Sequence, residues 1–107
     1  MRFGNIEIWE HTENDSKSPR RVHIVISGRV QGVGYRYFAL NSANELGLAG
    51  WVRNRPDGSV EIEAEGSQAP LDSFVLRLHQ GPKWSSVENV AVSQIEPKNE
   101  KKFEVVG

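Results

Sequence analysis

Apolar residues fall on every second position in two parts of the chain, and this spacing predicts β-strands. In RVHIVISG, the β-branched residues Val22, Ile24 and Ile26 follow this pattern, which is typical of a central strand. In VEIEAE, residues 60–65, three apolar residues alternate with three glutamates. We therefore expect this second strand to bury one face and to expose its glutamates to water.

Two other segments have the spacing of amphipathic helices. In YRYFALNSANELG, the positions that share one helical face are Phe38, Ala39, Ser42, Ala43 and Leu46. In APLDSFVLRLHQGP, the corresponding face is formed by Leu71, Phe74, Val75 and Leu78. Gly47 and Gly81 follow these segments and are well placed to end the two helices.

The order of the predicted elements indicates the fold class. Pro-Asp-Gly at 56–58 supplies the turn of a hairpin between the first helix and the second. Further strands are expected at 87–95 and 102–106, which gives the order β-α-β-β-α-β with a short terminal strand. Two helices with one apolar stripe each can cover only one face of such a sheet. We therefore predict a two-layer α+β sandwich of the split βαβ kind, with a mostly antiparallel sheet and both helices on one face.

The first twenty residues differ from the rest. HTENDSKSP is polar and rich in turn-forming residues, so residues 1–20 are expected to be a flexible or loosely docked extension that ends at Pro19. A short strand at 6–9 is the alternative. The domain itself is expected to span residues 21–107.

Composition excludes several classes of function. The 107 residues carry a formal net charge of −1 and no cysteine, which excludes disulfides, thiolate catalysis and cysteine zinc sites, and disfavours general nucleic-acid binding. No apolar run is long enough to span a bilayer, and the N-terminus lacks a signal-peptide core. We expect a cytoplasmic monomer that needs no metal or cofactor and binds neither nucleic acid nor membrane. Trp51 and Trp84 are expected to be packing residues.

The most informative segment is GRVQGVGYR, residues 28–36, which joins the first strand to the first helix. Glycines there let successive backbone N–H groups point into one concavity that suits an anion, next to the positive end of the helix dipole. Arg36, about one turn into the helix, can bring a planar guanidinium to two oxygens of a phosphate. The segment matches neither a P-loop nor a dinucleotide fingerprint, and it has no thiolate. It can bind a phosphoryl group but cannot attack one.

Asn54, at the end of the strand that leads to the hairpin turn, can complete such a site. Its amide can orient a water molecule but is a poor general base. This pairing therefore suits a phosphoryl group with a good leaving group, as in an acyl phosphate, where the transition state is loose.

Taken together, GRVQGVGYR and GWVRNRPDGSVE resemble the acylphosphatase family over roughly residues 21–106. The resemblance implies a ferredoxin-like sandwich that hydrolyses acyl phosphates to a carboxylate and inorganic phosphate without metal or cofactor. It implies that Arg36 binds the substrate and that Asn54 positions the attacking water. The phosphate cradle would be formed by the amides of Val30, Gln31, Gly32, Val33, Gly34 and Tyr35. The family usually has phenylalanine where this chain has Tyr35.

An alternative from a different class is a catalytically inactive module that binds anions on the same fold. By itself, Arg36 is typical of a solvated helix residue, and Asn54 is typical of a strand end that bonds its own backbone. The pair is informative because the predicted topology brings both to one edge of the sheet.

Overall fold

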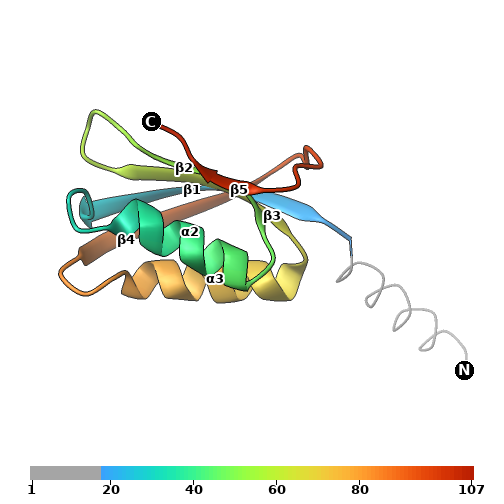
Figure 1. Cartoon of the computed structure of the whole chain (residues 1–107), viewed down its shortest axis with the longest axis horizontal. Helices are drawn as coiled ribbons and strands as arrows, with labels where there is room; N and C mark the ends of the chain where they lie inside the picture. The colour runs from blue at the N-terminus through green and yellow to red at the C-terminus, as the bar shows by residue number, and fades with distance from the viewer. Residues whose placement is uncertain (1–17) are drawn as a thin grey trace, which may run out of the picture.

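The structure, a computed structural model, describes residues 18–107. Its elements in chain order are β1 (Arg20–Arg29), α2 (Tyr35–Glu45), β2 (Ala49–Asn54), β3 (Val60–Gly66), α3 (Gln68–Gln80), β4 (Ser86–Ile95) and β5 (Phe103–Val105). This order confirms the predicted β-α-β-β-α-β arrangement with a short terminal strand (Figure 1). Most of the expected extension at 1–20, and the alternative strand at 6–9, lie outside the described residues.

The five strands form one sheet in the order β4-β1-β3-β2-β5. β1 pairs with both β3 and β4, and β2 pairs with β3, in each case antiparallel, whereas β5 runs parallel to β2. The prediction of a mostly antiparallel sheet is therefore confirmed. β2 and β3 form the expected hairpin, whose turn at 56–58 is closed by a hydrogen bond from Arg55 N to Ser59 O of 2.9 Å.

Both helices cover the same face of the sheet (Figure 1). The buried core between the two layers includes Ile24, Ile26, Val52, Ile62, Ala39, Ala43, Leu71, Phe74 and Leu78. These residues come from the predicted strand faces and helix stripes, so the two-layer ferredoxin-like sandwich is confirmed. Within residues 18–107, neither helix has the length and hydropathy that a membrane span requires.

The expectation of a water-exposed glutamate face on β3 is wrong. Arg21 on β1 is fully buried on that face, and its guanidinium bonds three carboxylates. The distances are 2.8 Å from Nε to Glu63 Oε1, 2.9 Å from Nη1 to Glu65 Oε1 and 2.7 Å from Nη2 to Glu100 Oε1. The β1–β3 register sets Arg21 opposite Glu65, so the cationic side chain covers the carboxylates that we expected to face water.

Glu65 is also bonded by the connection between β4 and β5. Its carboxylate accepts hydrogen bonds from the backbone N–H groups of Lys98 at 2.7 Å and Asn99 at 2.8 Å. Burial alone would raise the pKa of Glu65, but these bonds and the Arg21 guanidinium outweigh it and lower the pKa below its usual value. We call Arg21, Glu63, Glu65 and Glu100 the Arg21 cluster.

Trp84 is also not the packing residue that we expected, because its side chain is 77% exposed. It lies in the connection between α3 and β4 with a φ of 83°, outside both amphipathic helices. Its ring contacts the ammonium group of Lys83, which lies 5.2 Å from the ring centroid.

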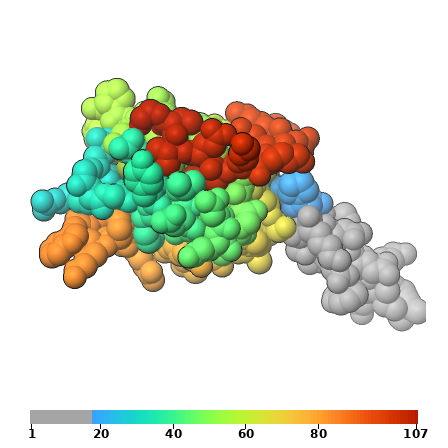
Figure 2. All heavy atoms as spheres, viewed as in Figure 1, coloured from blue at the N-terminus to red at the C-terminus, as the bar shows by residue number. Residues whose placement is uncertain are grey.

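The two ends of β1 lead to different parts of the molecule. Arg21, at its start, pairs with the last residue of β4, and Arg29, at its end, precedes the loop at 30–34. Figure 2 shows this loop and the β2–β3 turn at one end of the molecule, away from the start of β1. The candidate site therefore lies at the opposite end from the Arg21 cluster.

Candidate active site

The loop between β1 and α2 owes its shape to two glycines. Gly32 has a φ of 74° and Gly34 a φ of 79°, which lie in the left-handed region that other residues rarely adopt. A Cβ atom at either position would meet no neighbour within 4 Å, so the requirement for glycine comes from the backbone conformation and not from crowding. At these two glycines the backbone changes direction, so the chain passes from β1 to the start of α2 within five residues.

The first turn of α2 leaves its amide groups available to a ligand. The first helical hydrogen bond runs from Phe38 N to Gly34 O at 3.0 Å, so the preceding N–H groups have no acceptor within the helix. Gly34 occupies the N-cap position and offers no side chain to cap them. No acidic residue lies in this first turn. Free N–H groups and the helix dipole together favour an anion at this point.

Gln31 connects the loop to the turn that follows Asn54. Its Nε2 donates to the carbonyl oxygens of Arg55 and Ser59, both at 2.8 Å. The turn itself is held by Asp57, whose Oδ1 accepts from Ser59 N at 2.9 Å and from Ser59 Oγ at 2.6 Å. The side-chain and backbone hydrogen bonds from Ser59 lower the pKa of Asp57. Gln31 therefore fixes the distance between the loop and the end of β2.

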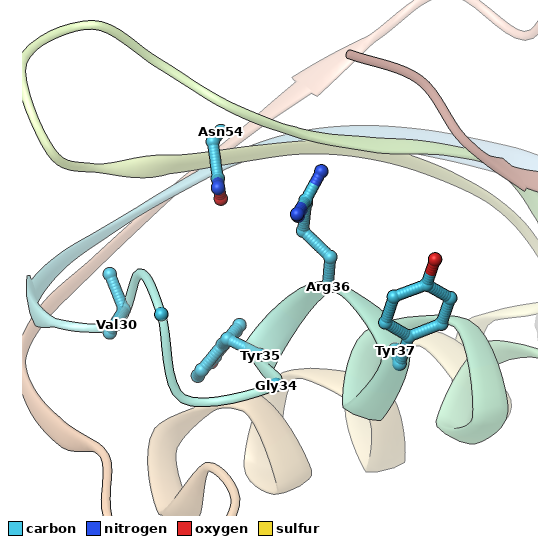
Figure 3. A pocket seen from close by; sticks show the side chains of 7 residues that line it. Val30, Gly34, Tyr35, Arg36, Tyr37 and Asn54 are labelled. Atoms are coloured by element: carbon cyan, nitrogen blue, oxygen red, sulfur yellow. The ribbon is translucent and has the colours of Figure 1, made fainter.

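Asn54 and Arg36 line one cavity of about 240 Å³ between β2 and the start of α2. Figure 3 shows the Asn54 side chain pointing from β2 toward the helix and the Arg36 side chain rising from the helix toward β2. Asn54 Oδ1 is shielded from solvent and has no hydrogen-bond partner among the described residues. A buried oxygen without a partner is rare in native proteins, because its desolvation is costly. Asn54 therefore contributes to the cavity an amide whose oxygen the described residues leave without a hydrogen bond.

Arg36 is held by the end of the chain that follows β5. Its Nη1 donates to Gly107 O at 2.8 Å. This segment is itself fixed to the sheet, because Val106 N donates to Val52 O at 2.9 Å. A guanidinium has five N–H donors, so this bond leaves others free for an anion in the cavity.

The predicted site residues divide into two groups. The cavity is lined by Val30, Gly32, Gly34, Tyr35, Arg36, Tyr37 and Asn54. Gln31 and Val33 are absent from this lining, and Gln31 instead bonds the hairpin turn. The roles of all eight predicted residues remain predictions.

Two tyrosines at the start of α2 lie in different surroundings. The Tyr35 ring is buried in the core and its hydroxyl donates to Leu78 O, and burial raises its pKa. Tyr37 lines the cavity although its side chain is 61% exposed, and sequence reasoning missed it. It lies off the apolar stripe of α2, so its position next to Arg36 was the only available signal.

The histidine and acidic side chains of the described residues lie in smaller groups. Within residues 18–107, the structure brings together no set of three or more histidine, aspartate or glutamate side chains that could hold a metal ion. His23 Nε2 lies 2.7 Å from Glu61 Oε2, and Arg53 Nε lies 2.7 Å from Glu61 Oε1. These groups are paired on the sheet and do not line the cavity.

Fold and cavity together define a small α+β sandwich protein with a glycine-containing loop at a helix N-terminus. Comparison with known proteins gives the family. Residues 22–105 match the family model for acylphosphatase. An acylphosphatase of Bifidobacterium longum is 56% identical over 72 residues, which cover 67% of this chain and 74% of the relative. An acylphosphatase of Trichormus variabilis is 48% identical over 85 residues, which cover 79% and 84%.

Solved structures agree with this assignment. The crystal structure of acylphosphatase from Bacillus subtilis aligns with a TM-score of 0.81 at 42% sequence identity, covering 82% of this chain and 99% of that one. The chain belongs to the acylphosphatase family.

Proposed function

We propose that Arg36, Asn54 and the backbone amides of residues 30–35 carry out the hydrolysis of acyl phosphates to a carboxylate and inorganic phosphate. The class of reaction follows from membership of the acylphosphatase family, and the roles of the individual residues are the proposal. The observation that carries the proposal is that Asn54 lines the same cavity as Arg36, while its buried Oδ1 has no partner among the described residues.

The phosphate group binds between the loop and Arg36. Its oxygens accept hydrogen bonds from the amides at the start of α2, where the helix dipole adds partial positive charge. Arg36 supplies a full positive charge and a planar set of donors, which suits two phosphate oxygens at once. Gly32 and Gly34 line the cavity without side chains, so the backbone can approach the anion closely.

The attacking water binds to Asn54. Its Oδ1 accepts a hydrogen bond from one O–H of the water, which leaves a lone pair of the water oxygen free to point at phosphorus. This contact satisfies the oxygen that otherwise has no partner, so the water is bound in a defined orientation. Asn54 therefore acts by positioning, which converts attack by bulk solvent into attack from a fixed point.

The bond changes require no general base from the protein. The water oxygen forms a bond to phosphorus while the bond between phosphorus and the acyl oxygen breaks, and the acyl group leaves as a carboxylate. The water proton passes to an oxygen of the substrate's own phosphate. No aspartate, glutamate or histidine lines the cavity within residues 18–107. A carboxylate is a weak base and a good leaving group, so little proton abstraction is needed in a loose transition state.

Two substitutions separate these roles. Arg36→Ala should weaken inhibition by inorganic phosphate and lower kcat/KM for benzoyl phosphate by about 100-fold or more, because it removes a group that stabilises transition-state charge. Asn54→Ala should keep phosphate inhibition near the wild-type value while kcat falls by about 100-fold, since its contact is made mainly in the transition state. Asn41→Ala, on the exposed side of α2, is the matched control and should change neither quantity.

Steady-state release of inorganic phosphate from benzoyl phosphate and from p-nitrophenyl phosphate measures these effects. The wild-type protein should cleave the anhydride and leave the ester almost intact. Turnover by Asn54→Ala at the wild-type rate would refute the water-positioning role. Phosphate binding by the wild type without cleavage of benzoyl phosphate would instead support an inactive anion-binding module.

A further inference from the structure

Tyr37 is an exposed aromatic residue at the edge of the cavity. It is the third residue of α2 and directly follows Arg36. Its side chain is 61% exposed, yet it lines the same cavity as Arg36 and Asn54. Figure 3 shows its ring rising from the first turn of α2, on the far side of Arg36 from Asn54. The ring therefore lies where the cavity meets solvent. The proposed function gives roles to Arg36 and Asn54 but none to Tyr37.

The direction in which the acyl group leaves follows from the position of the water. Attacking and leaving oxygens lie roughly in line through phosphorus. If the water is bound by Asn54 on the β2 side, the acyl oxygen departs on the side away from Asn54. That side is formed by the start of α2, where Tyr37 supplies an exposed ring.

The other side chains of the cavity cannot supply such a contact. Val30 and Tyr35 are buried, and Gly32 and Gly34 have no side chain. Arg36 and Asn54 are assigned to the phosphate and the water. Within residues 18–107, Tyr37 is thus the lining residue that combines a large apolar surface with access to solvent.

We infer that Tyr37 is a specificity-determining residue that packs against the acyl group. It favours acyl phosphates whose acyl part carries an aromatic ring or an extended apolar chain over those as small as acetyl phosphate. This inference rests on the proposed function, because it uses the positions assigned to phosphate and water. An offset or edge-on contact between two rings is typically enough for about a fivefold preference.

The test compares kcat/KM for benzoyl phosphate with kcat/KM for acetyl phosphate. Tyr37→Ala should lower the benzoyl-to-acetyl ratio by about fivefold, because only the larger acyl group reaches the ring. Tyr37→Phe should keep the ratio near the wild-type value, since the ring makes the contact and the hydroxyl does not. Leu76→Ala removes a similarly exposed apolar side chain from α3, outside the cavity lining, and should leave the ratio unchanged.

Each outcome bears on a different statement. A wild-type ratio in Tyr37→Ala would overturn the inference while leaving the proposed function intact, provided that Arg36→Ala lowers kcat/KM for both substrates by about 100-fold or more. An equal loss in Tyr37→Phe and Tyr37→Ala would show that the hydroxyl is the recognition group, which contradicts apolar packing. Failure of the wild type to cleave either acyl phosphate would overturn the proposed function itself.

Discussion

Two polar clusters lie toward opposite ends of β1, and they are built in opposite ways. In the Arg21 cluster, each of the three carboxylates bonds the Arg21 guanidinium, and Glu65 also accepts two backbone N–H groups. In the cavity at the other end, Asn54 Oδ1 is buried with no partner among the described residues, and the amides at the start of α2 have no cap. The carboxylates of the Arg21 cluster therefore have hydrogen-bond partners within the protein, whereas Asn54 Oδ1 in the cavity has none among the described residues.

This difference distinguishes the Arg21 cluster, a structural one, from the proposed binding site. Buried polar groups that bond one another hold segments of the chain together, and removing one partner leaves the others buried and unpaired. Buried polar groups without partners cost stability, and proteins keep them where a ligand completes them. Charge alone would not separate the two, because each region contains a conspicuous arginine. Hydrogen bonds separate the Arg21 guanidinium and its three carboxylates from Asn54 Oδ1, although Arg20 Nε, beside Arg21 in the sequence, is also buried without a partner among the described residues.

The largest expected effect is on stability and comes from the Arg21 cluster. Arg21→Met removes the cation from three carboxylates, of which Glu65 is 5% exposed, and should lower the free energy of unfolding by about 3–5 kcal/mol. Urea denaturation at neutral pH measures this change. The residual folded protein should keep its kcat, because the cluster lies at the far end of β1 from the cavity.

A matched arginine provides the control for this substitution. Arg77 on α3 pairs with Glu45 on α2 at the surface, where both side chains are more than one third exposed. Arg77→Met should cost less than about 1 kcal/mol, since exposed ion pairs contribute little. Equal losses for the two arginine variants would show that the Arg21 cluster has no special structural role.

The second effect is expected at the proposed active site and comes from Gln31. Gln31→Met keeps the length of the side chain but loses both hydrogen bonds to the hairpin turn. We expect a loss of about 1–2 kcal/mol in the free energy of unfolding and a roughly tenfold fall in kcat/KM, because the loop and Asn54 are no longer held at a fixed distance. Urea denaturation and benzoyl phosphate kinetics measure the two quantities.

Gln68→Met is the control for the Gln31 substitution. Gln68 makes one exposed hydrogen bond to Asp72 on α3, far along the chain from the loop. Loss of this bond in Gln68→Met should change neither the free energy of unfolding nor kcat/KM measurably. If Gln31→Met behaves in the same way as Gln68→Met, then the connection between loop and turn does not position the site.

A smaller and pH-dependent effect is expected from the glutamates on β3. Hydrogen bonds and ion pairs lower the pKa of Glu61, Glu63 and Glu65 below the ordinary value of 4.5. Because the folded-state pKa lies below the unfolded one, these carboxylates stabilise the fold above about pH 4.5, and this stability is lost as the pH falls through their folded-state pKa values. Thermal unfolding from pH 7 to pH 3 should show this loss.

Glu65→Gln tests the origin of the acid sensitivity. The variant should be less stable than the wild type at pH 7 but should lose less stability between pH 5 and pH 3, since one titrating carboxylate is gone. Glu104→Gln, at an exposed position on β5, should follow the wild-type curve. A Glu65→Gln curve parallel to that of the wild type would contradict the assignment.

The fold could be predicted from the sequence because each element carries its own local pattern. The alternation at 22–26, the helix stripes and the Pro-Asp-Gly turn all depend on neighbouring residues, and the structure confirms the elements they indicate. The loop at 28–36 drew attention because its glycines come directly before a predicted helix start, where free backbone N–H groups can receive an anion. The proximity of Arg36 and Asn54 then followed from the topology.

What the sequence could not predict depends on contacts between distant positions. The glutamates of β3 appeared to form a solvated face because their partner Arg21 lies 42 to 44 residues away, and pairing depends on strand register. The two acceptors of Gln31 are backbone carbonyl oxygens, which carry no signal in residue type. Tyr37 had no apolar periodicity to mark it, and Trp84 lies in a turn where aromatic content wrongly suggested packing.

The central claim is that Asn54 binds the attacking water through its Oδ1. Asn54→Ala tests this claim most directly, because kcat and the free energy of unfolding can both be measured on the same sample. We predict that kcat for benzoyl phosphate falls by about 100-fold while the free energy of unfolding stays the same or rises by about 1 kcal/mol, because a buried acceptor without a partner is removed. A kcat near the wild-type value, or a loss of stability comparable to that of Arg21→Met, would contradict the account.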